Sequence, residues 1–479
     1  MIGSTRSFRD PAGRLIVVDG RVLRLVAKPA IDSLFALLRS QTAQQFTERG
    51  SLIQTRVAEE VDGKSLCCQM PDDFRFDNSG PGIVVEHSRV DFPSFAHEWP
   101  PEMLHAAAQL TLELAAAFLD EGVGLKDADP RNILFRGPRP VFVDILSFEK
   151  RDPNDPVWRP YAQFVRNFLL PLLVNKHFSI PLSQLYLTGH DGLRPQDVYP
   201  LLGLASKLLP PFFTLVTLPV WLSRTVGKRN VAMYQKKRQS DAEKTKFILR
   251  SLFHRLARLT DKITPGQGES DWSSYMSSNG YSSEEFSAKK SFVETALAEA
   301  RPKRILDVGC NIGYFSLAAA RQGARVVAID SDPAVVGETW RQALKEDLDV
   351  LPLVVNIASP TPGVGWRNRE STSFLERSFG AFDAVMMLAV VHHILVTGQI
   401  PLYEMAGLAS ELTNDLLLIE FVSPKDPLFR SITLGRDYLY DGLAAETFET
   451  AFRDRFDIVR TLTLCNGNRS LYVMRKKLH

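Results

Sequence analysis

Cysteine is scarce in this sequence and is not placed for a metal site or a disulfide framework. The four cysteines in 479 residues are Cys67, Cys68, Cys310 and Cys465, without a Cys-x-x-Cys pair or a Cys/His cluster. Structural zinc sites need such ligands at short spacings, so this class of site is excluded. Neighbours such as Cys67 and Cys68 rarely bond to each other, and we expect a reducing, cytoplasmic compartment.

An excess of charge of either sign is also missing. Lys and Arg number 57 and Asp and Glu 55, which gives no signal for nucleic-acid binding. The first ten residues lack the apolar core of a signal peptide. The most apolar stretch, 208–222, is too short to span a bilayer and contains three prolines. We expect no transmembrane segment and interpret this stretch as buried, with an interfacial position as the alternative.

The first 200 residues mix strand and helix patterns. Two β-rich runs at 12–26 flank the turn dipeptide Asp19-Gly20, which predicts a hairpin. Helical periodicity follows at 101–121. We expect an α+β domain over 1–200.

A basic, helical connector is predicted over 201–285. Within it, 224–262 carries twelve Lys and Arg against three Asp and Glu. We interpret this segment as solvated; contact with an anionic partner or a peripheral membrane surface is the alternative.

Strand and helix patterns alternate over 286–479. Such alternation is typical of a parallel sheet covered by helices on both faces. The last two strands are joined by the short turn 465–468, which predicts an antiparallel pair at one edge. We expect an α/β fold with strands at 303–308, 325–329, 351–357, 382–388, 415–422, 457–463 and 469–475.

A glycine-bearing loop follows the first of these strands. Residues 305–313 read Ile-Leu-Asp-Val-Gly-Cys-Asn-Ile-Gly; Gly309 permits a tight turn and Gly313 lets the backbone approach a ligand. Asp330 ends the second strand, where a carboxylate can accept hydrogen bonds from both hydroxyls of a ribose. Its alternative role is a helix N-cap, but Asp332 suits that cap better.

The loop departs from the dinucleotide pattern because Asn311 stands where a middle glycine is expected. This makes a pyrophosphate less suitable than an S-adenosylmethionine. Residues 287–479 resemble class I S-adenosylmethionine-dependent methyltransferases, with a seven-stranded Rossmann-like sheet. The resemblance implies that Asp307 orders the loop and approaches the amino group of the donor, that the two glycines line its amino-acid part, and that Asp330 holds the ribose. The implied cofactor-binding set is Asp307, Gly309, Cys310, Asn311, Gly313, Asp330, Ser331, Asn356, Ile357 and Leu388.

The resemblance also implies roles for Asn356 and Leu388. Asn356, before Ile357, stands where the family often places an acid that bonds the adenine amino group; an amide oxygen can accept the same bond. The fourth strand ends at Leu388, which the resemblance places under the sulfonium.

Candidate catalytic groups follow the fourth and fifth strands. His392 and His393 border the implied acceptor pocket, and either can serve as the general base of methyl transfer; the alternative is that they pack or cap a helix. Glu420 ends the fifth strand and faces the ligand edge or makes a structural hydrogen bond. The long insertion 359–376, with Trp366-Arg367-Asn368, is a candidate acceptor lid.

Three aromatic residues precede the first helix of this domain, Trp272, Tyr275 and Tyr281. They either cover the donor site or pack in the core.

The N-terminal domain carries a second pattern. Asp127 is followed by Asn132 five residues later and by Asp144 at the end of a strand, which resembles the catalytic loop of kinase-like phosphotransferases. The resemblance implies that Asp127 is a catalytic base and that Asn132 and Asp144 are metal ligands for magnesium and ATP. A turn built by Asp129-Pro130 is the structural alternative.

The kinase-like pattern is incomplete. No glycine-rich phosphate loop is present in 1–60, and Arg24 or Lys28 replaces the usual lysine. Together with Leu-Lys-Asp-Ala at 125–128 and Leu-Ser-Phe-Glu at 146–149, the two domains resemble bacterial nodulation-type methyltransferases.

Three hypotheses follow from the sequence. The first is a methyltransferase acting on a small-molecule, glycan or protein acceptor. The second is a bifunctional phosphotransferase and methyltransferase. The third is a nucleotide-binding scaffold with a pseudokinase half.

Overall fold

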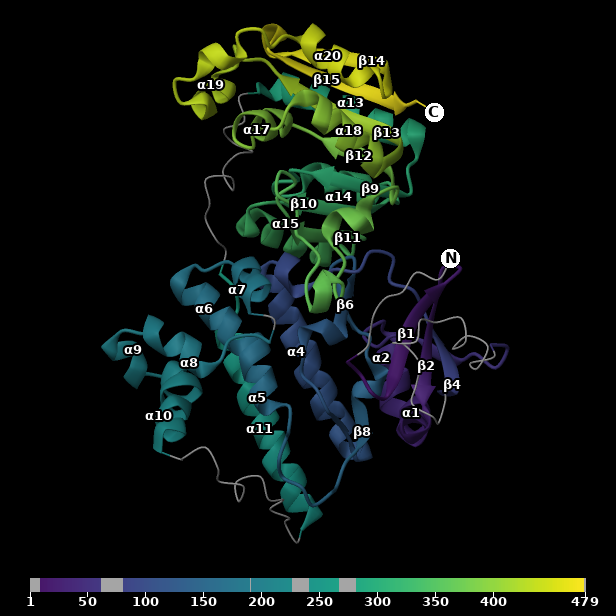
Figure 1. The fold of residues 1–479 in the computed structure, drawn as a ribbon, viewed down its shortest axis with the longest axis vertical. Coiled ribbons are helices and arrows are strands. Elements are labelled where there is room, and N and C mark those ends of the chain that lie inside the picture. Colours follow the sequence, from purple (N-terminus) through teal and green to yellow (C-terminus); the bar gives the residue numbers. More distant parts are fainter. Residues whose placement is uncertain (1–8, 62–80, 190, 226–240, 267–280, 478–479) are drawn as a thin grey trace. The chain divides into compact units, whose positions relative to one another are not determined.

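The computed structural model describes residues 9–61, 81–189, 191–225, 241–266 and 281–477 (Figure 1). The chain forms two compact units. The first comprises residues 1–97, 101–266 and 364–371, and the second comprises 98–100, 267–363 and 372–479.

The first unit contains an antiparallel sheet in the order β1-β2-β4-β3. The hairpin predicted at 12–26 is present, because β1 (Gly13–Val18) pairs with β2 (Arg21–Ala27) around Asp19 and Gly20, whose φ values are 50° and 79°. Two short antiparallel pairs lie outside this sheet. The remaining strands of the unit are β3 (Thr55–Val57), β4 (Pro81–His87), β5 (Val123–Leu125) with β8 (Phe148–Lys150), and β6 (Ile133–Arg136) with β7 (Arg139–Phe142).

Helices make up most of the rest of the first unit. The helix predicted at 101–121 is α4 (Pro101–Ala117), extended by a 3-10 turn and closed by Gly122 in the left-handed region at φ 70°. The others are α1 (Ile31–Leu38), α2 (Gln41–Glu48), α5 (Tyr161–Phe164), α6 (Leu170–Phe178), α7 (Leu182–Thr188), α8 (Pro195–Val198), α9 (Leu204–Leu208), α10 (Leu218–Thr225) and α11 (Ala242–Lys262).

The basic segment that we interpreted as a solvated connector includes one of these packed helices. Along α11 the side chains of Leu249, Phe253 and Leu256 are buried, and α11 lies beside α4 in Figure 1. His105 Nε2 of α4 lies 3.0 Å from the backbone oxygen of Thr260. The helix is amphipathic, so its cations occupy the outer face while its apolar face completes the core of the first unit.

The apolar stretch 208–222 is only partly buried. Phe212, Leu215 and Val216 belong to the core, whereas Leu208 and Leu222 are exposed. Among the described residues, no helix combines the length and hydropathy needed to cross a bilayer. The interpretation of this stretch as simply buried is therefore wrong for its outer residues.

The second unit is built on a seven-stranded sheet in the order β11-β10-β9-β12-β13-β15-β14. The first five strands run parallel, and β15 pairs antiparallel with both β13 and β14, which confirms the predicted edge. The strands are β9 (Arg304–Val308), β10 (Arg325–Asp330), β11 (Val350–Val354), β12 (Phe382–Met387), β13 (Thr413–Val422), β14 (Phe456–Leu464) and β15 (Arg469–Lys476).

Helices pack on this sheet through apolar side chains. Val293 and Leu297 of α13 (Ser283–Ala300) join Ile305 and Ala384 of the sheet in one buried cluster. Asp332 caps α15, as the sequence predicts, by accepting a hydrogen bond from the backbone N–H of Ala334 at 2.9 Å. The other helices are α14 (Tyr314–Arg321), α15 (Pro333–Glu346), α16 (Phe374–Ser378), α17 (Val391–Val396), α18 (Leu402–Leu412), α19 (Pro427–Thr433) and α20 (Ala445–Arg453).

Candidate active site

The glycine loop lies at the carboxyl end of β9 and folds back onto β10. The backbone N–H groups of Gly309 and Cys310 both donate to the carbonyl of Ile329, at 2.8 and 3.0 Å. Gly309, Asn311 and Gly313 have φ values of 75°, 52° and 76°. Glycine and asparagine tolerate this left-handed region best, which explains their presence in this loop.

The sequence predicts that the backbone at Gly313 approaches a ligand closely. In the structure this backbone packs closely against another helix of the same unit. A Cβ at this position would lie 2.5 Å from Cγ2 of Thr339 in α15. Thr339 Oγ1 donates to the carbonyl of Asn311 at 3.0 Å. At Gly309 a Cβ would lie 2.9 Å from Cγ2 of Val390. Both glycines are therefore needed to fit the loop between α15 and the end of β12.

Asp330 turns its carboxylate toward the glycine loop. One oxygen, Oδ2, accepts from the backbone N–H of Asn311 at 2.9 Å, and Oδ1 accepts from the N–H of Asp332 at 3.1 Å. Burial raises the pKa of Asp330, although these backbone donors oppose the shift. The two ends of the predicted donor site are thus joined by a direct hydrogen bond.

Asp307 is buried beneath the loop, with 3% of its surface exposed. Its Oδ2 accepts from the hydroxyl of Ser316 in α14 at 2.5 Å. Burial raises the pKa of Asp307 to about 7, and the negative charge of Asp330 adds to the shift against the opposing hydrogen bond of Ser316. This carboxyl group is therefore poised to ionise near neutral pH.

The other predicted cofactor residues lie at the ends of neighbouring strands. Ser331 is exposed after β10, while Ile357 and Leu388 are buried after β11 and β12. Asn356 is exposed, and its Oδ1 accepts from the backbone N–H of Ala358 at 2.9 Å. An adenine amino group would have to share that oxygen.

The two candidate bases lie side by side in α17. The rings of His392 and His393 are 4.2 Å apart between centroids. His392 is buried, and its Nδ1 has no hydrogen-bond partner among the described residues. Burial, with the charge of His393, lowers the pKa of His392 well below its ordinary value, and burial also lowers that of His393. Both rings are therefore neutral at pH 7, the form that accepts a proton.

Glu420 lies at the centre of a buried charge cluster at the carboxyl end of β13. Its Oε2 lies 2.6 Å from Nζ of Lys289 in α13, and its Oε1 accepts from the hydroxyl of Tyr281. The guanidinium of Arg469 lies 4.4 Å from the centre of the Tyr281 ring and binds Asp426 at 2.7 Å. Tyr281 thus belongs to this cluster, whereas Trp272 and Tyr275 lie outside the described residues.

Lys289 and Arg469 were missed by the sequence analysis. Lys289 occupies the apolar face of α13, four residues before Val293. A lysine is rarely buried unless it is paired with an acidic group. The position of Lys289 on the apolar face of the helix was therefore the signal in the sequence that could have identified it as a buried, paired residue. Arg469 carries no comparable signal, because its partner Asp426 is 43 residues away.

The insertion predicted as an acceptor lid is divided between the units. Residues 364–371, which include Trp366-Arg367-Asn368, belong to the first unit. Trp366 is 64% exposed, and Arg367 and Asn368 have positive φ values of 56° and 55°. The lid role stays a prediction.

The residues predicted to form a kinase-like site lie close together in the first unit. Arg24 of β2 forms an ion pair with Oδ1 of Asp144, and Ser147 donates to Oδ2 at 2.6 Å. Asn132 Nδ2 lies 3.2 Å from the Ser147 hydroxyl. Burial, followed by the charge of Asp144, raises the pKa of Asp127. Burial opposes ionisation of Asp144, but Arg24 and Ser147 keep its pKa below the ordinary value.

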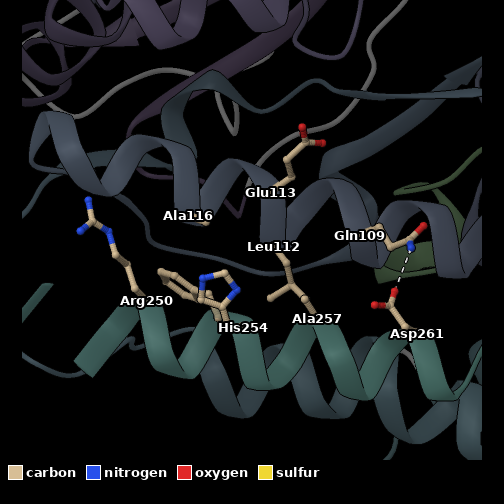
Figure 2. A pocket seen from close by; sticks show the side chains of 9 residues that line it. Gln109, Leu112, Glu113, Ala116, Arg250, His254, Ala257 and Asp261 are labelled. Carbon is tan, nitrogen blue, oxygen red and sulfur yellow. Dashed lines mark hydrogen bonds between the residues drawn. The ribbon is translucent and has the colours of Figure 1, made fainter. Parts of the chain in front are cut away.

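Each oxygen of Asp144 already has one protein partner, Arg24 at Oδ1 and Ser147 at Oδ2, so a magnesium ion bound there would share these oxygens with the two side chains or displace them. Across the described part of the chain, no group of three or more His, Cys, Asp or Glu side chains is placed to hold a metal. A groove between α4 and α11 lies elsewhere in this unit (Figure 2). It is lined by Leu112 and Ala257 with charged groups around them, and by none of the predicted kinase-like residues.

The site in the second unit suits an adenosyl ligand with a charged amino-acid part. Each carboxylate oxygen can accept two hydrogen bonds, so Asp330 keeps acceptor capacity for ribose hydroxyls beyond its two backbone donors. Asp307 offers a carboxylate that a ligand ammonium would hold in its ionised form.

Comparison with known proteins finds methyltransferases. Residues 281–417 match the family model described as a methyltransferase domain. Over 474 residues the chain is 28% identical to nodulation protein NoeA of Rhizobium meliloti (strain 1021), covering 98% of this chain and 95% of that protein. It is 29% identical over 139 residues to the O-antigen chain terminator bifunctional methyltransferase/kinase WbdD of Escherichia coli, covering 29% of this chain and 18% of WbdD.

Among solved structures, magnesium protoporphyrin IX methyltransferase from Synechocystis PCC 6803, with bound SAH, is similar at 19% identity and a TM-score of 0.29. The match covers 40% of this chain and 82% of that one. The chain is an S-adenosylmethionine-dependent methyltransferase, and its methyltransferase domain lies in the second unit.

Proposed function

We propose that the second unit transfers a methyl group from S-adenosylmethionine, bound at the glycine loop, to a small-molecule or glycan acceptor. The observation that carries the donor site is the hydrogen bond from the Asn311 N–H to the Asp330 carboxylate. It joins the loop to the strand-end acid, so that one ligand can contact both.

In this proposal each residue has a defined task. Asp330 accepts hydrogen bonds from the ribose hydroxyls, and Asp307 pairs with the ammonium of the donor. When bound, S-adenosylmethionine supplies a methyl group activated by its sulfonium. The chain contributes alignment and exclusion of water, and Leu388 and Ile357 supply buried apolar walls.

A neutral His392 or His393 would take the proton that an acceptor hydroxyl or amine loses. The support is their position in α17, directly after β12. Burial lowers both pKa values, which keeps the rings in the neutral form that accepts a proton, although it makes each a weaker base than a free imidazole. The support for a glycan acceptor is the likeness to WbdD, whose name describes it as an O-antigen chain terminator.

Donor binding tests the proposal. Isothermal titration with S-adenosylhomocysteine should give micromolar-range affinity for the wild-type chain and none for Asp330→Ala. Asp457→Ala is the matched control, because that carboxylate is 70% exposed on the edge strand β14. Equal affinity in Asp330→Ala and wild type would overturn the ribose assignment.

The acceptor needs a separate experiment. The chain is incubated with methyl-labelled donor and a cell extract, and the labelled product is identified. Label in a glycan or small molecule supports the proposal, whereas label only in protein or nucleic acid contradicts it.

A second candidate function for the first unit is phosphoryl transfer. It is favoured by the placement of Asp127 near Asp144, and of Asn132 and Arg24 around that carboxylate. Magnesium-dependent ATP binding that is lost in Asp144→Ala would support it. No binding in the wild-type chain would leave the first unit as a pseudokinase.

A further inference from the structure

A buried serine lies on the inner face of α14, the helix that follows the glycine loop. Ser316 has none of its surface exposed, and the residues after it, Leu317 to Ala320, are buried as well. A hydroxyl on such an apolar face costs free energy unless it has a hydrogen-bond partner. The partner of Ser316 therefore accounts for a polar residue at this position.

That partner is the carboxylate of Asp307 in β9. The Ser316 hydroxyl donates to Oδ2 of Asp307 at 2.5 Å, a length typical of a hydroxyl bonded to an ionised carboxylate. Within the described part of the chain, no residue donates a hydrogen bond to Oδ1. The two oxygens of one buried carboxylate thus differ, because Oδ2 has a fixed protein partner and Oδ1 keeps its acceptor capacity.

We propose that Ser316 is a positioning residue of the donor site, which fixes Oδ2 of Asp307 and leaves Oδ1 to pair with the ammonium group of S-adenosylmethionine. This inference rests on the proposed function, in which Asp307 binds that ammonium. Ser316 itself does not contact the ligand. A carboxylate held at one oxygen has its orientation set before the ligand binds, so less order has to be gained on binding.

The same hydrogen bond favours the ionised form of Asp307. Burial raises the pKa of Asp307 to about 7, and the hydroxyl of Ser316 opposes that rise, because a donor to a carboxylate stabilises its negative charge. Without the hydroxyl, the carboxyl group would be mostly protonated at neutral pH. A protonated Asp307 cannot form an ion pair with an ammonium.

Ionisable groups on neighbouring elements also act on Asp307. The negative charge of Asp330 at the end of β10 raises its pKa, and the positive charge of Lys289 in α13 lowers it. Burial raises the pKa of the Cys310 thiol well above its ordinary value, so that group is neutral. Ser316 differs from all three because it donates a hydrogen bond directly to the carboxylate.

Binding of S-adenosylhomocysteine, which carries the same ammonium, tests the inference when it is measured by isothermal titration at two pH values. If Ser316→Ala raises the pKa of Asp307 by about one unit, the ionised fraction at about pH 7 falls from about one half to about one tenth. Affinity should then be about fivefold below that of the wild-type chain at about pH 7, and nearly equal to it at about pH 9. Ser316→Thr keeps the hydroxyl and should bind like the wild-type chain at both.

Ser378→Ala is the matched control. Ser378 is fully buried in the same unit, but its hydroxyl donates to the backbone carbonyl of Phe374 within α16, at 2.8 Å. This variant should keep wild-type donor affinity at both pH values. Melting temperatures of the two alanine variants compare the stability cost of losing a buried hydroxyl, and the fold should persist in both because alanine favours helices.

The variants also separate this inference from the proposed function. The double variant Ser316→Ala/Asp307→Asn should bind no more weakly than Asp307→Asn alone, because the serine acts through the carboxylate. If Asp307→Asn binds like the wild-type chain at about pH 7, the pairing of Asp307 with the ammonium is wrong, and the inference is overturned with it.

Three results would overturn the role of Ser316 while Asp307→Asn still weakens binding. They are wild-type affinity in Ser316→Ala at neutral pH, a loss of affinity that is the same at both pH values, and a further loss in the double variant. The second would assign Ser316 a purely structural role.

Discussion

The carboxylate of Asp330 accepts a hydrogen bond from the backbone N–H of Asn311 at 2.9 Å, across 19 positions of sequence. The bond sets the distance between the loop after β9 and the end of β10. Since both contribute to the proposed donor site, the geometry of that site is determined by the protein before a ligand arrives.

Donor affinity should depend on pH through Asp307. The pKa of this carboxyl is about 7, so it is mostly protonated below that value and cannot pair with the ammonium of the donor. We expect affinity for S-adenosylhomocysteine to fall about tenfold between about pH 8 and about pH 6. Isothermal titration at both values measures this change, and Asp307→Asn should remove it. A pH dependence that persists in the variant would point to another group.

Gly313→Ala should destabilise the second unit more than Gly323→Ala. Both glycines have positive φ, 76° and 94°, but a Cβ at Gly313 meets Thr339 at 2.5 Å whereas nothing lies within 4 Å at Gly323. Backbone strain alone costs about 1–2 kcal/mol, and the clash adds about 1–3 kcal/mol. Urea unfolding of the two variants compares these costs. Equal losses would mean that the loop moves away from α15 without penalty.

Lys289→Met should cost about 3–5 kcal/mol in the free energy of unfolding, because it removes the cation 2.6 Å from the buried Glu420 and leaves only Arg469, at 4.0 Å, to balance that charge. The matched control is Arg460→Met, whose partner Glu299 is 55% exposed; a surface pair contributes at most about 1 kcal/mol. Addition of Glu420→Gln to Lys289→Met should recover part of the loss. Chemical denaturation measures the free energy of unfolding of the two single variants and the double variant. A small loss in Lys289→Met would show that water reaches the buried charge cluster.

Arg24→Met should destabilise the first unit, since Asp144 would keep its charge in a largely buried position. The side chains of Arg24 and Asp144 are 10% and 20% exposed, and the expected loss is about 2–4 kcal/mol. Asp144→Asn in the same chain should reverse much of it. If Arg24→Met instead raises magnesium-dependent ATP affinity without loss of stability, the ion pair acts as a competitor of the metal.

The sheet of the second unit was predictable because its strands alternate with helices and because residues typical of turns and helix starts mark the strand ends. Asp332, followed by Pro333, marked the helix start that the structure shows. The sequence predicted the glycine loop after β9, but it did not predict that Gly313 packs against Thr339. Thr339 lies 26 positions later, and no local pattern links the two residues. Contacts of this kind depend on how α14 and α15 pack, which periodicity does not encode.

The basic helix α11 shows a different limit. Its charge count predicts a solvated segment, yet Leu249, Phe253 and Leu256 share one face and are buried. Net charge describes the outer face of an amphipathic helix, and the spacing of its apolar residues decides the inner face. The buried ion pairs of Arg469 could not be predicted for a related reason, because its partners lie at distant positions in the sequence.

A crystal structure of the full chain with S-adenosylhomocysteine tests the proposed donor site most directly. We predict that both ribose hydroxyls lie about 3 Å from the Asp330 carboxylate, with the amino-acid part of the ligand against the loop of Gly309 and Gly313. A ligand bound elsewhere, or a ribose turned away from Asp330, would contradict it.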